Sequence, residues 1–379
     1  MRVTFFGNFL NHHQIPFCNE MAKHLDDRFT FIATSKITDE RLQLGYKDYS
    51  DTFGYSINAY ESEKQNQKAL ALARESDVVI FGSAPERFLT PRLATDRLTF
   101  RYSERLFKRG TYRLMDPRVL AMSLEKHTRH RKKNLHLLCA SAYAARDASL
   151  LFAYPDKMWK WGYFPQVYEY SLDERFKHSP EDTVKILWTG RFIDWKHPEY
   201  AIRLAKVLKI KNYDFSLIMI GDGMLKSKVE KLAHRIGLQD KIRFMGAMST
   251  EDVRSHMMSS DIFLVTSDKQ EGWGAVVNES MNSACAVIVS DAVGAAHFMV
   301  KHNYNGLLFK SGDLSDLINK AEYLLINKNE IRRLGQNAYN TMTSEWNAGV
   351  AAQRLLKLTE SILERKEAPF LHGPCSKAD

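Results

Sequence analysis

Short apolar runs alternate with amphipathic helical patterns along the first half of the chain. The runs of strand length are residues 2–7, 29–34, 78–82, 98–103 and 136–141, and the helical patterns cover residues 16–25, 117–132 and 144–150. Strands that alternate with helices are typical of parallel β-α-β units. The first half therefore predicts an α/β domain built on a parallel sheet.

The second half repeats this alternation with clearer boundaries. Its strand-length runs are residues 184–189, 215–220, 241–245, 262–266 and 286–290, and its helical patterns cover residues 198–208, 224–236, 250–258 and 274–284. Three more helical segments follow Gly312. Several strands end in Gly, Ser or Asp, and in open parallel sheets ligands bind beyond the carboxyl ends of the strands.

The length of 379 residues favours two domains, because a single core rarely grows so large. We predict a first domain over residues 1–165 and a second over residues 184–345. Between them, residues 166–183 form a polar, acidic linker. Residues 346–366 are expected to form a C-terminal helix, and residues 367–379, which contain two prolines and a glycine, a flexible tail.

Composition is ordinary for a soluble globular protein, with 44% hydrophobic and 26% charged residues, which argues against disorder and coiled coils. No run approaches the roughly 18 apolar residues of a transmembrane helix. Residues 1–10 lack a small-residue cleavage site and are predicted to be a strand rather than a signal peptide. Cys18, Cys139, Cys285 and Cys375 form no CxxC pair, which argues against a zinc site or a disulfide framework and favours the cytosol.

Positive charge is concentrated in one segment, residues 87–133. It holds 14 Lys and Arg and 4 acids, a balance of +10, whereas the remaining residues hold 40 bases and 41 acids, a balance of −1. Such a segment can face an anionic membrane, an anionic substrate or nucleic acid. A solvated helical surface is the less favoured alternative.

The first candidate motif follows the predicted strand 184–189. Gly190 allows a turn, and Arg191 and Lys196 lie five residues apart before a helix that begins near Pro198. Arg offers a planar fork and Lys a compact charge, and together they suit a diphosphate. A solvated loop with two surface cations is the alternative, so this motif is weak by itself.

A second turn, Gly221-Asp222-Gly223, follows the strand 215–220. Its glycines permit a tight turn and a close approach of the backbone to a ligand. An ordinary turn of an α/β protein explains the same residues.

The strongest motif places two glutamates eight residues apart, Glu271 in a loop and Glu279 inside the following helix. The first helical turn, residues 274–277, would present free N–H groups and a dipole to phosphate. Five residues of helix rise about 7.5 Å, which is about the reach from a diphosphate to a ribose diol. A solvated Glu271 and a surface ion pair of Glu279 remain the alternative for each residue alone.

Residues 184–325 resemble the donor domain of GT-B glycosyltransferases of the large retaining family 4, the glycosyl transferases group 1. The shared elements occur in order. They are Gly190, Arg191 and Lys196; Gly221–Gly223; Arg243–Gly246; Glu271–Glu279; and Asn305–Phe309 with Gly312 and Asp313.

This resemblance implies an α/β fold of two Rossmann-like parallel-sheet domains that face a cleft, with the C-terminal helix crossing back to the first domain. It implies that Arg191 and Lys196 hold the donor diphosphate, that Glu271 touches the transferred sugar, and that Glu279 binds the ribose. Arg191, Lys196 and Glu271 are thus the catalytic candidates. The other candidates for donor binding are Gly190, Gly221, Asp222, Gly223, Gly272, Trp273, Gly274, Ala275 and Val276.

The chain departs from the family pattern at four places. The family often has Gly after the Lys, where this chain has His197 and Pro198, and its Gly-x-Pro becomes residues 284–286. Its double glycine becomes Gly294-Ala295, and Phe298 replaces a frequent Glu. These differences concern the shape of the nucleotide pocket.

The first half resembles the family only in architecture. The loop after the first strand contains Gly7, Asn11, His12 and His13, and Glu104 follows the strand 98–103. These five residues are candidates for lining the cleft on the acceptor side. A surface-loop role is the alternative for both histidines.

The resemblance implies a metal-independent transferase that moves a sugar from a nucleotide-sugar to an acceptor hydroxyl with retention, in surface polysaccharide or glycolipid assembly. No cofactor is expected, and the protein is expected in the cytoplasm, with the basic segment in peripheral contact with an anionic membrane. A nucleotide-sugar epimerase of the same fold is an alternative, although no clear acid–base pair of carboxylates appears in the first half. A nucleic-acid-binding protein is less favoured, because the basic segment lacks interleaved aromatic residues.

Overall fold

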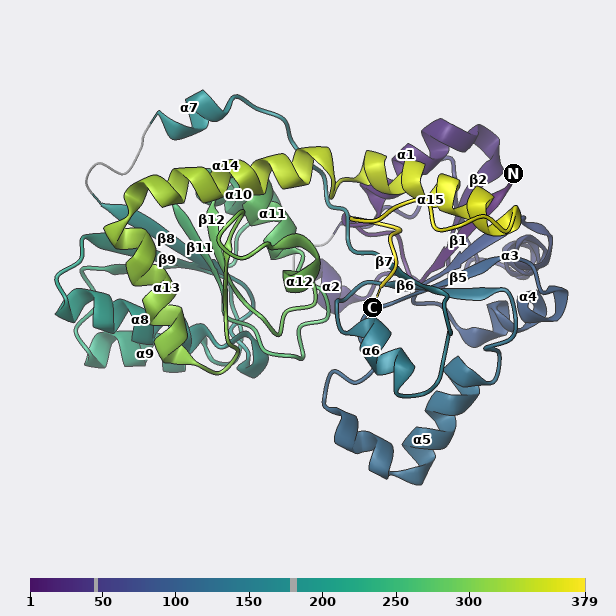
Figure 1. Ribbon diagram of the computed structural model, residues 1–379, viewed down its shortest axis with the longest axis horizontal. Helices are drawn as coiled ribbons and strands as arrows, with labels where there is room; N and C mark the ends of the chain where they lie inside the picture. The colour runs from purple at the N-terminus through teal and green to yellow at the C-terminus, as the bar shows by residue number, and fades with distance from the viewer. Residues whose placement is uncertain (44–46, 178–182, 379) are drawn as a thin grey trace. The chain divides into compact units, whose positions relative to one another are not determined.

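A computed structural model describes residues 1–43, 47–177 and 183–378. The chain folds into two compact units, which are described separately (Figure 1). The first unit comprises Met1–Gln166 and Asn347–Asp379, and the second comprises Val167–Trp346. Residues 178–182 of the predicted linker lie outside the described residues.

The sheet of the first unit has the described strands in the order β3-β2-β1-β4-β5-β6-β7, and every neighbouring pair is parallel. The strands are β1 (Val3–Gly7), β2 (Phe29–Ala33), β3 (Ser56–Asn58), β4 (Val78–Phe81), β5 (Thr99–Ser103), β6 (Leu135–Cys139) and β7 (Met158–Lys160). Sequence patterning missed β3 and β7, because three residues are too few to show a period.

The helices of the first unit surround this sheet. They are α1 (Ile15–Leu25), α2 (Asp39–Gln43), α3 (Glu63–Glu75), α4 (Thr90–Thr95), α5 (Pro117–Ser123), α6 (Ala144–Ser149) and α15 (Ala348–Leu363). Pro16 stands in the first turn of α1, where a missing N–H costs nothing, and Phe17, Met21 and Leu25 form its buried face. Helix α15 packs against α1, so the C-terminal helix belongs to the first unit.

The sheet of the second unit has the described strands in the order β10-β9-β8-β11-β12-β13, again all parallel. They are β8 (Val184–Thr189), β9 (Phe215–Ile220), β10 (Ile242–Gly246), β11 (Ile262–Val265), β12 (Ala286–Ser290) and β13 (Leu307–Phe309). Two parallel-sheet α/β units confirm the predicted fold class.

Helices cover both faces of the second sheet. Helix α8 packs beside α9 and α13 in one layer, and α11 packs beside α10 and α14 in the other (Figure 1). Their bounds are α8 (Pro198–Ile210), α9 (Lys226–Arg235), α10 (Thr250–Met258), α11 (Val276–Asn282), α12 (Ala296–Met299), α13 (Leu314–Ile326) and α14 (Lys328–Ser344). No helix in the described part of the chain is long and apolar enough to cross a membrane.

Residues 167–177, which the sequence analysis assigned to the linker, belong to the second unit. They include α7 (Leu172–Phe176). The Tyr170 hydroxyl donates to the Asn282 carbonyl at 2.6 Å, and Arg175 Nε donates to the Ser283 carbonyl at 3.0 Å. These bonds hold the segment to the end of α11.

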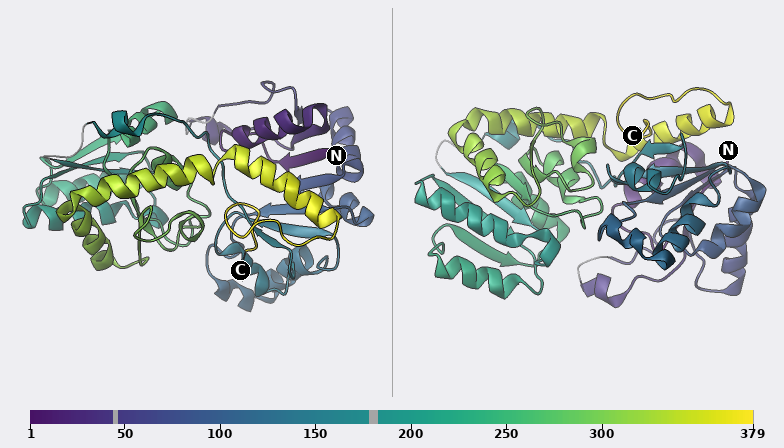
Figure 2. Two further views of the ribbon diagram at one scale, coloured as in Figure 1. Left: turned by 45° about the horizontal axis from the view of Figure 1, so that its top comes forward. Right: turned by 60° about the horizontal axis from the view of Figure 1, so that its bottom comes forward.

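The last residues of the chain are ordered against β7, whereas the sequence analysis expected a flexible tail. Cys375 and Ser376 are fully buried, and Trp159 forms an antiparallel bridge with Lys377. The backbone N–H of Lys160 donates to Ser376 and that of Cys375 donates to Lys160, both at 2.7 Å. The yellow C-terminal segment returns beside β7 in Figures 1 and 2. Proline and glycine shape this segment into turns without leaving it free.

Deleting residues 372–379 should lower the free energy of unfolding of the first unit. The deletion removes the backbone bonds to Lys160 and the burial of Cys375 and Ser376, which together are worth roughly 3 kcal/mol. Urea denaturation followed by circular dichroism measures the change. Leu371→Ala is the control, because Leu371 is 85% exposed and should leave the midpoint unchanged. An unchanged midpoint for the deletion would contradict a structural role of the tail.

Candidate functional site

The strand order of the second unit reverses at β8. The chain adds β9 and β10 on one side of β8 and then returns to add β11 on the other side. Ligands of open α/β sheets bind beyond the carboxyl ends of the strands at such a reversal. The loop after β8 carries Lys196, and the loop after β11 carries Glu271.

Lys196 and Glu271 form an ion pair across these two loops. Their side chains are 14% and 15% exposed. The structure therefore brings the predicted diphosphate cation into direct contact with the predicted sugar-binding carboxylate. Their partial burial strengthens the attraction relative to that of a surface pair.

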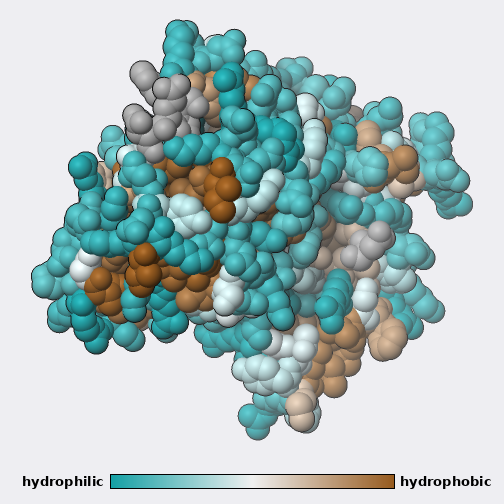
Figure 3. All heavy atoms as spheres, turned by 60° about the vertical axis from the view of Figure 1, so that its left-hand side comes forward, coloured by the Kyte–Doolittle hydropathy of each residue, from teal (hydrophilic) through white to brown (hydrophobic). Residues whose placement is uncertain are grey.

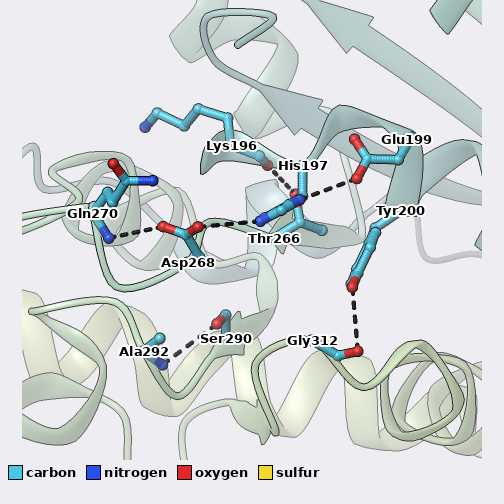
Figure 4. Close-up of polar contacts among 10 residues, drawn as sticks. All are labelled: Lys196, His197, Glu199, Tyr200, Thr266, Asp268, Gln270, Ser290, Ala292 and Gly312. Atoms are coloured by element: carbon cyan, nitrogen blue, oxygen red, sulfur yellow. Dashed lines mark hydrogen bonds and ion pairs between the residues drawn. The ribbon is translucent and has the colours of Figure 1, made fainter. Parts of the chain in front are cut away.

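Thr266, directly after β11, fixes the loop that carries Lys196. Its hydroxyl accepts a hydrogen bond from Trp188 Nε1 at 2.9 Å and donates one to the Lys196 carbonyl at 2.7 Å. Figure 4 shows Thr266 beside Lys196. This threonine was not predicted from the sequence, since a polar residue at a strand end has no spacing signal of its own.

His197 occupies a left-handed backbone conformation with φ 47°. The family often has glycine here, and glycine adopts this conformation without strain, whereas another residue is strained by about 1 kcal/mol or more. Its Nδ1 lies 3.0 Å from Glu199 Oε1 and its Nε2 lies 3.4 Å from Asp268 Oδ2 (Figure 4). The hydrogen bond with Glu199, aided by Asp268, raises the pKa of His197. These two contacts link His197 to both carboxylates and help to offset the strain.

Arg191 lies in the same loop and is exposed. Its guanidinium stands over the Trp195 ring at 5.7 Å, and within the described ranges it forms no ion pair. The predicted second cation of the diphosphate clamp therefore presents its charge to solvent.

Gly221 and Gly223 are required by packing between two loops. Both have positive φ, and a Cβ on Gly221 would lie 2.0 Å from the Gly190 carbonyl oxygen. A Cβ on Gly223 would lie 2.6 Å from the Phe192 carbonyl oxygen. The exposed Asp222 accepts a hydrogen bond from the Gly223 N–H at 2.7 Å. Close packing thus explains the glycines of this turn without a ligand.

The segment after Glu271 is more deeply buried than the sequence analysis expected. Gly272 is buried, and Trp273 is fully buried. The Trp273 indole donates to Asn278 Oδ1 at 2.8 Å, and its ring centroid lies 6.0 Å from that of Trp346. The predicted donor-binding tryptophan therefore lies in the core and positions the loop from behind.

Helix α11 begins at Val276, two residues later than the predicted 274. Gly274 has φ 87°, and a Cβ there would lie 2.7 Å from Val293 Cγ1. Ala275 is the N-cap residue, and no side chain caps the helix. The Ala275 side chain therefore does not cap the first turn of α11, whose Val277 N–H donates to the Gly274 carbonyl at 2.9 Å.

Glu279 on α11 is under the electrostatic influence of two cations. Burial raises the pKa of Glu279 to about 7, while Arg254 and Lys196 act in the opposite direction. Arg254 comes from α10, lies over the Tyr168 ring at 3.6 Å and donates to Asn282 Oδ1 at 3.2 Å. Arg254 could not be predicted from the sequence, because its partners are far away along the chain.

The first unit contains a cavity of about 820 Å³ at the carboxyl ends of β1, β4 and β5. Of the acceptor-side candidates, Asn11, His13 and Glu104 line it. Glu104 pairs with Lys108 and accepts a hydrogen bond from the Tyr163 hydroxyl at 2.6 Å. The His13 ring stacks on Tyr163 with centroids 5.7 Å apart.

The other two acceptor-side candidates are placed differently. Gly7 ends β1, and a Cβ there would lie 2.7 Å from Phe31, so packing explains this glycine. His12 is not among the residues that line the cavity, and its ring centroid lies 3.8 Å from that of His13.

Buried charge in the cavity was not predicted. Arg101 from β5 is 4% exposed and donates to both carboxylate oxygens of Glu86 at 2.8 and 3.0 Å. Lys126 lies 3.3 Å from the same carboxylate. Burial acts to lower the pKa of Arg101, but Glu86 outweighs it and raises this pKa. Patterning predicted β5 but could not show that Glu86 faces it.

A model of the family described as Glycosyl transferases group 1 matches residues 171–341. An uncharacterized glycosyltransferase of Methanocaldococcus jannaschii is 35% identical over 153 residues, which are 40% of this chain and 41% of that protein. A GDP-mannose-dependent alpha-(1-6)-phosphatidylinositol monomannoside mannosyltransferase of Mycobacterium tuberculosis is 23% identical over 190 residues, 48% of this chain and 49% of that protein. The alignments thus span less than half of the length of these curated relatives.

The crystal structure of Anabaena Alr3699/HepE in complex with UDP resembles the whole chain. The TM-score is 0.70 at 14% identity, with 95% of this chain and 100% of that chain covered. This likeness confirms the predicted GT-B fold.

Replacing Glu279 should change how stability depends on pH. Its folded pKa of about 7 lies above the ordinary value of 4.5, so ionisation is penalised in the folded state, and stability is lost as the pH rises from about 4.5 through 7. Glu279→Gln should therefore raise the free energy of unfolding by about 1 to 3 kcal/mol at pH 8 and hardly at all at pH 4. Urea denaturation at both pH values measures the difference. An equal effect at both would contradict the raised pKa.

Proposed function

We propose, on the premise that residues 171–341 belong to the family of glycosyl transferases group 1, that the protein transfers a sugar from a nucleotide-sugar to an acceptor hydroxyl with retention of configuration. The observation that carries the proposal is the Lys196–Glu271 ion pair between the carboxyl ends of β8 and β11. It places a cation suited to phosphate beside a carboxylate suited to sugar hydroxyls. A nucleotide-sugar contains both groups in one molecule.

In this proposal the donor diphosphate binds Lys196 and replaces Glu271 as its ion-pair partner. Arg191, which is exposed beside it, supplies the second charge. The uncapped start of α11 adds N–H groups and a positive helix end. These groups stabilise the negative charge that develops on the leaving diphosphate, and we propose that they do so without a metal.

Glu271, released from Lys196, accepts hydrogen bonds from hydroxyls of the transferred sugar. Glu279 lies eight residues further on and accepts hydrogen bonds from the ribose. The acceptor hydroxyl attacks from the face of the leaving group, and the departing phosphate takes its proton. This front-face route requires no protein base and retains the configuration.

The relatives favour a nucleoside diphosphate sugar without selecting its base. The mycobacterial relative is named for GDP-mannose, whereas the Anabaena protein was solved with UDP and with UDP-glucose. The named acceptor of the mycobacterial relative is a phosphatidylinositol monomannoside. We propose a cytoplasmic enzyme of surface polysaccharide or glycolipid assembly that touches the membrane peripherally.

A donor screen tests the proposal and both predicted cations. Nucleoside diphosphate released from several nucleotide-sugars is measured in the presence of EDTA, with and without candidate acceptor. Arg191→Ala and Lys196→Ala should each lower kcat about a hundredfold, because a lost contact to the leaving group costs roughly 3 kcal/mol. Lys209→Ala is the control, since Lys209 pairs with Asp240 on the exposed surface. Activity of both variants at the wild-type level would refute the clamp, and epimerisation without acceptor would favour an epimerase.

Substitution of the two glutamates should affect different kinetic constants. Glu279→Gln should raise the KM for the donor, because the ribose does not react, whereas Glu271→Gln should lower kcat, because its carboxylate lies beside the reacting sugar. Steady-state kinetics with varied donor concentration measure both constants. The reverse pattern would show that the two positions have been exchanged.

A further inference from the structure

One surface of the first unit exposes apolar side chains to solvent. It consists of Tyr112, Met115, Leu120, Met122, Leu124, Leu150 and Phe152, and is called the α5 surface below. Met115 is 85% exposed, Phe152 76% and Met122 72%. Neither the 3-10 helix Thr111–Met115 nor α5 contains a buried residue. Contiguous exposed apolar groups of this kind mark an interaction surface.

Two segments distant in sequence form this surface together. The Thr128 hydroxyl, at the end of the π-helical turn Leu124–Thr128, donates to the Leu151 carbonyl at 2.6 Å. This bond holds the loop with Leu150 and Phe152 beside the segment that continues α5. Phe152 has φ 51°, a strained conformation for a non-glycine residue, and the strained residue carries an exposed aromatic ring.

The surface is surrounded by positive charge. Residues 105–133 contain ten Lys and Arg and two acids, a balance of +8. Arg113, Arg118 and Arg129 are exposed in the same elements. In Figure 3 the protrusion at the lower end of the view, where Figure 1 places α5, exposes brown and pale atoms. Exposed Met and Phe among Arg and Lys are typical of segments that lie in a membrane interface.

We infer that the α5 surface docks on an anionic lipid bilayer, with Met115, Met122 and Phe152 inserted between the lipids and the surrounding cations on the lipid phosphates. The positive charge of the α5 surface favours a lipid bilayer over two other partners. A second copy would oppose two surfaces of the same strong positive charge, and nucleic acid would leave the methionines and leucines without apolar contact.

This docking rests on the peripheral membrane contact of the proposed function, although not on the transferase reaction, and it adds inserted apolar groups to an electrostatic contact. Charge alone would release the protein when salt shortens the screening length. Inserted apolar groups are not screened, so part of the binding should persist at about 0.5 M salt, where that length is below the roughly 8 Å of physiological salt.

Vesicle flotation with the full chain tests the inference. The protein should float with vesicles of phosphatidylcholine and phosphatidylglycerol at 3:1 and far less with phosphatidylcholine alone. The double variant Met115→Gln, Met122→Gln should lower the partition coefficient at least tenfold and abolish the part that resists salt. Glutamine and methionine have similar helix propensities, so α5 should still form. Met224→Gln is the matched control, because Met224 is 81% exposed on the second unit and should leave binding unchanged.

Three outcomes would overturn the inference: no flotation with anionic vesicles, equal loss in the double variant and the Met224 control, or complete release of the wild-type protein by salt. A concentration-dependent dimer that the double variant abolishes, without vesicle binding, would assign the surface to a second copy instead. Donor turnover with a water-soluble acceptor is measured in parallel and should be unchanged in the double variant. Failure of the transferase proposal would leave flotation intact, so the two failures are distinguishable.

Discussion

The ion pair of Lys196 and Glu271 is the interaction around which the second unit is organised. Each residue lies between the end of a central strand and the start of a helix, β8 before α8 and β11 before α11. The pair therefore joins the two connections that lead from the sheet into these helices. Thr266 and His197 reinforce the same connection with hydrogen bonds between the two loops. Several polar contacts thus hold the two loops together at the end of the sheet where a ligand would bind.

Holding two opposite charges partly away from water has an energetic consequence. Each charge loses hydration that its partner must replace, so removal of one charge leaves the other poorly compensated. Under the proposed function, a ligand can replace Glu271 beside Lys196 only if it carries a negative charge of its own. A free neutral sugar cannot do so, whereas a nucleoside diphosphate sugar can. The pair thus makes occupation of the site depend on the phosphate part of the donor.

Sequence patterning was most successful for the buried strands of the second unit, whereas the helix α3 was missed. Strands such as β8, β9 and β12 occur at their predicted bounds, because a buried parallel strand is a continuous apolar run with polar ends. The motifs likewise predicted that Lys196 and Glu271 belong to one ligand site at the carboxyl ends of the strands. Patterning could not show that Trp273 faces the core, because tryptophan suits a buried position and a ligand contact equally.

Contacts between distant segments were beyond prediction. Three features depend on residues that meet only in the folded chain. They are the pair of Arg101 with Glu86, the position of Arg254 near Glu279, and the ordered tail. The left-handed conformation of His197 is similar, since the sequence showed only that a frequent glycine was absent. Comparison with a family pattern can locate such a position but not supply its geometry.

The ordered tail also changes the character of the first sheet. Strand β7 is the last strand at its side of the sheet, and an uncovered edge strand offers its N–H and C=O groups to any other extended chain. Here Cys375, Ser376 and Ala378 form backbone hydrogen bonds with part of that edge. The Lys377 ammonium stands 4.3 Å from the Trp159 ring centroid. A charged residue of the chain itself thus occupies the place where a foreign strand would pair. The tail thus hinders edge-to-edge pairing of this sheet with another chain.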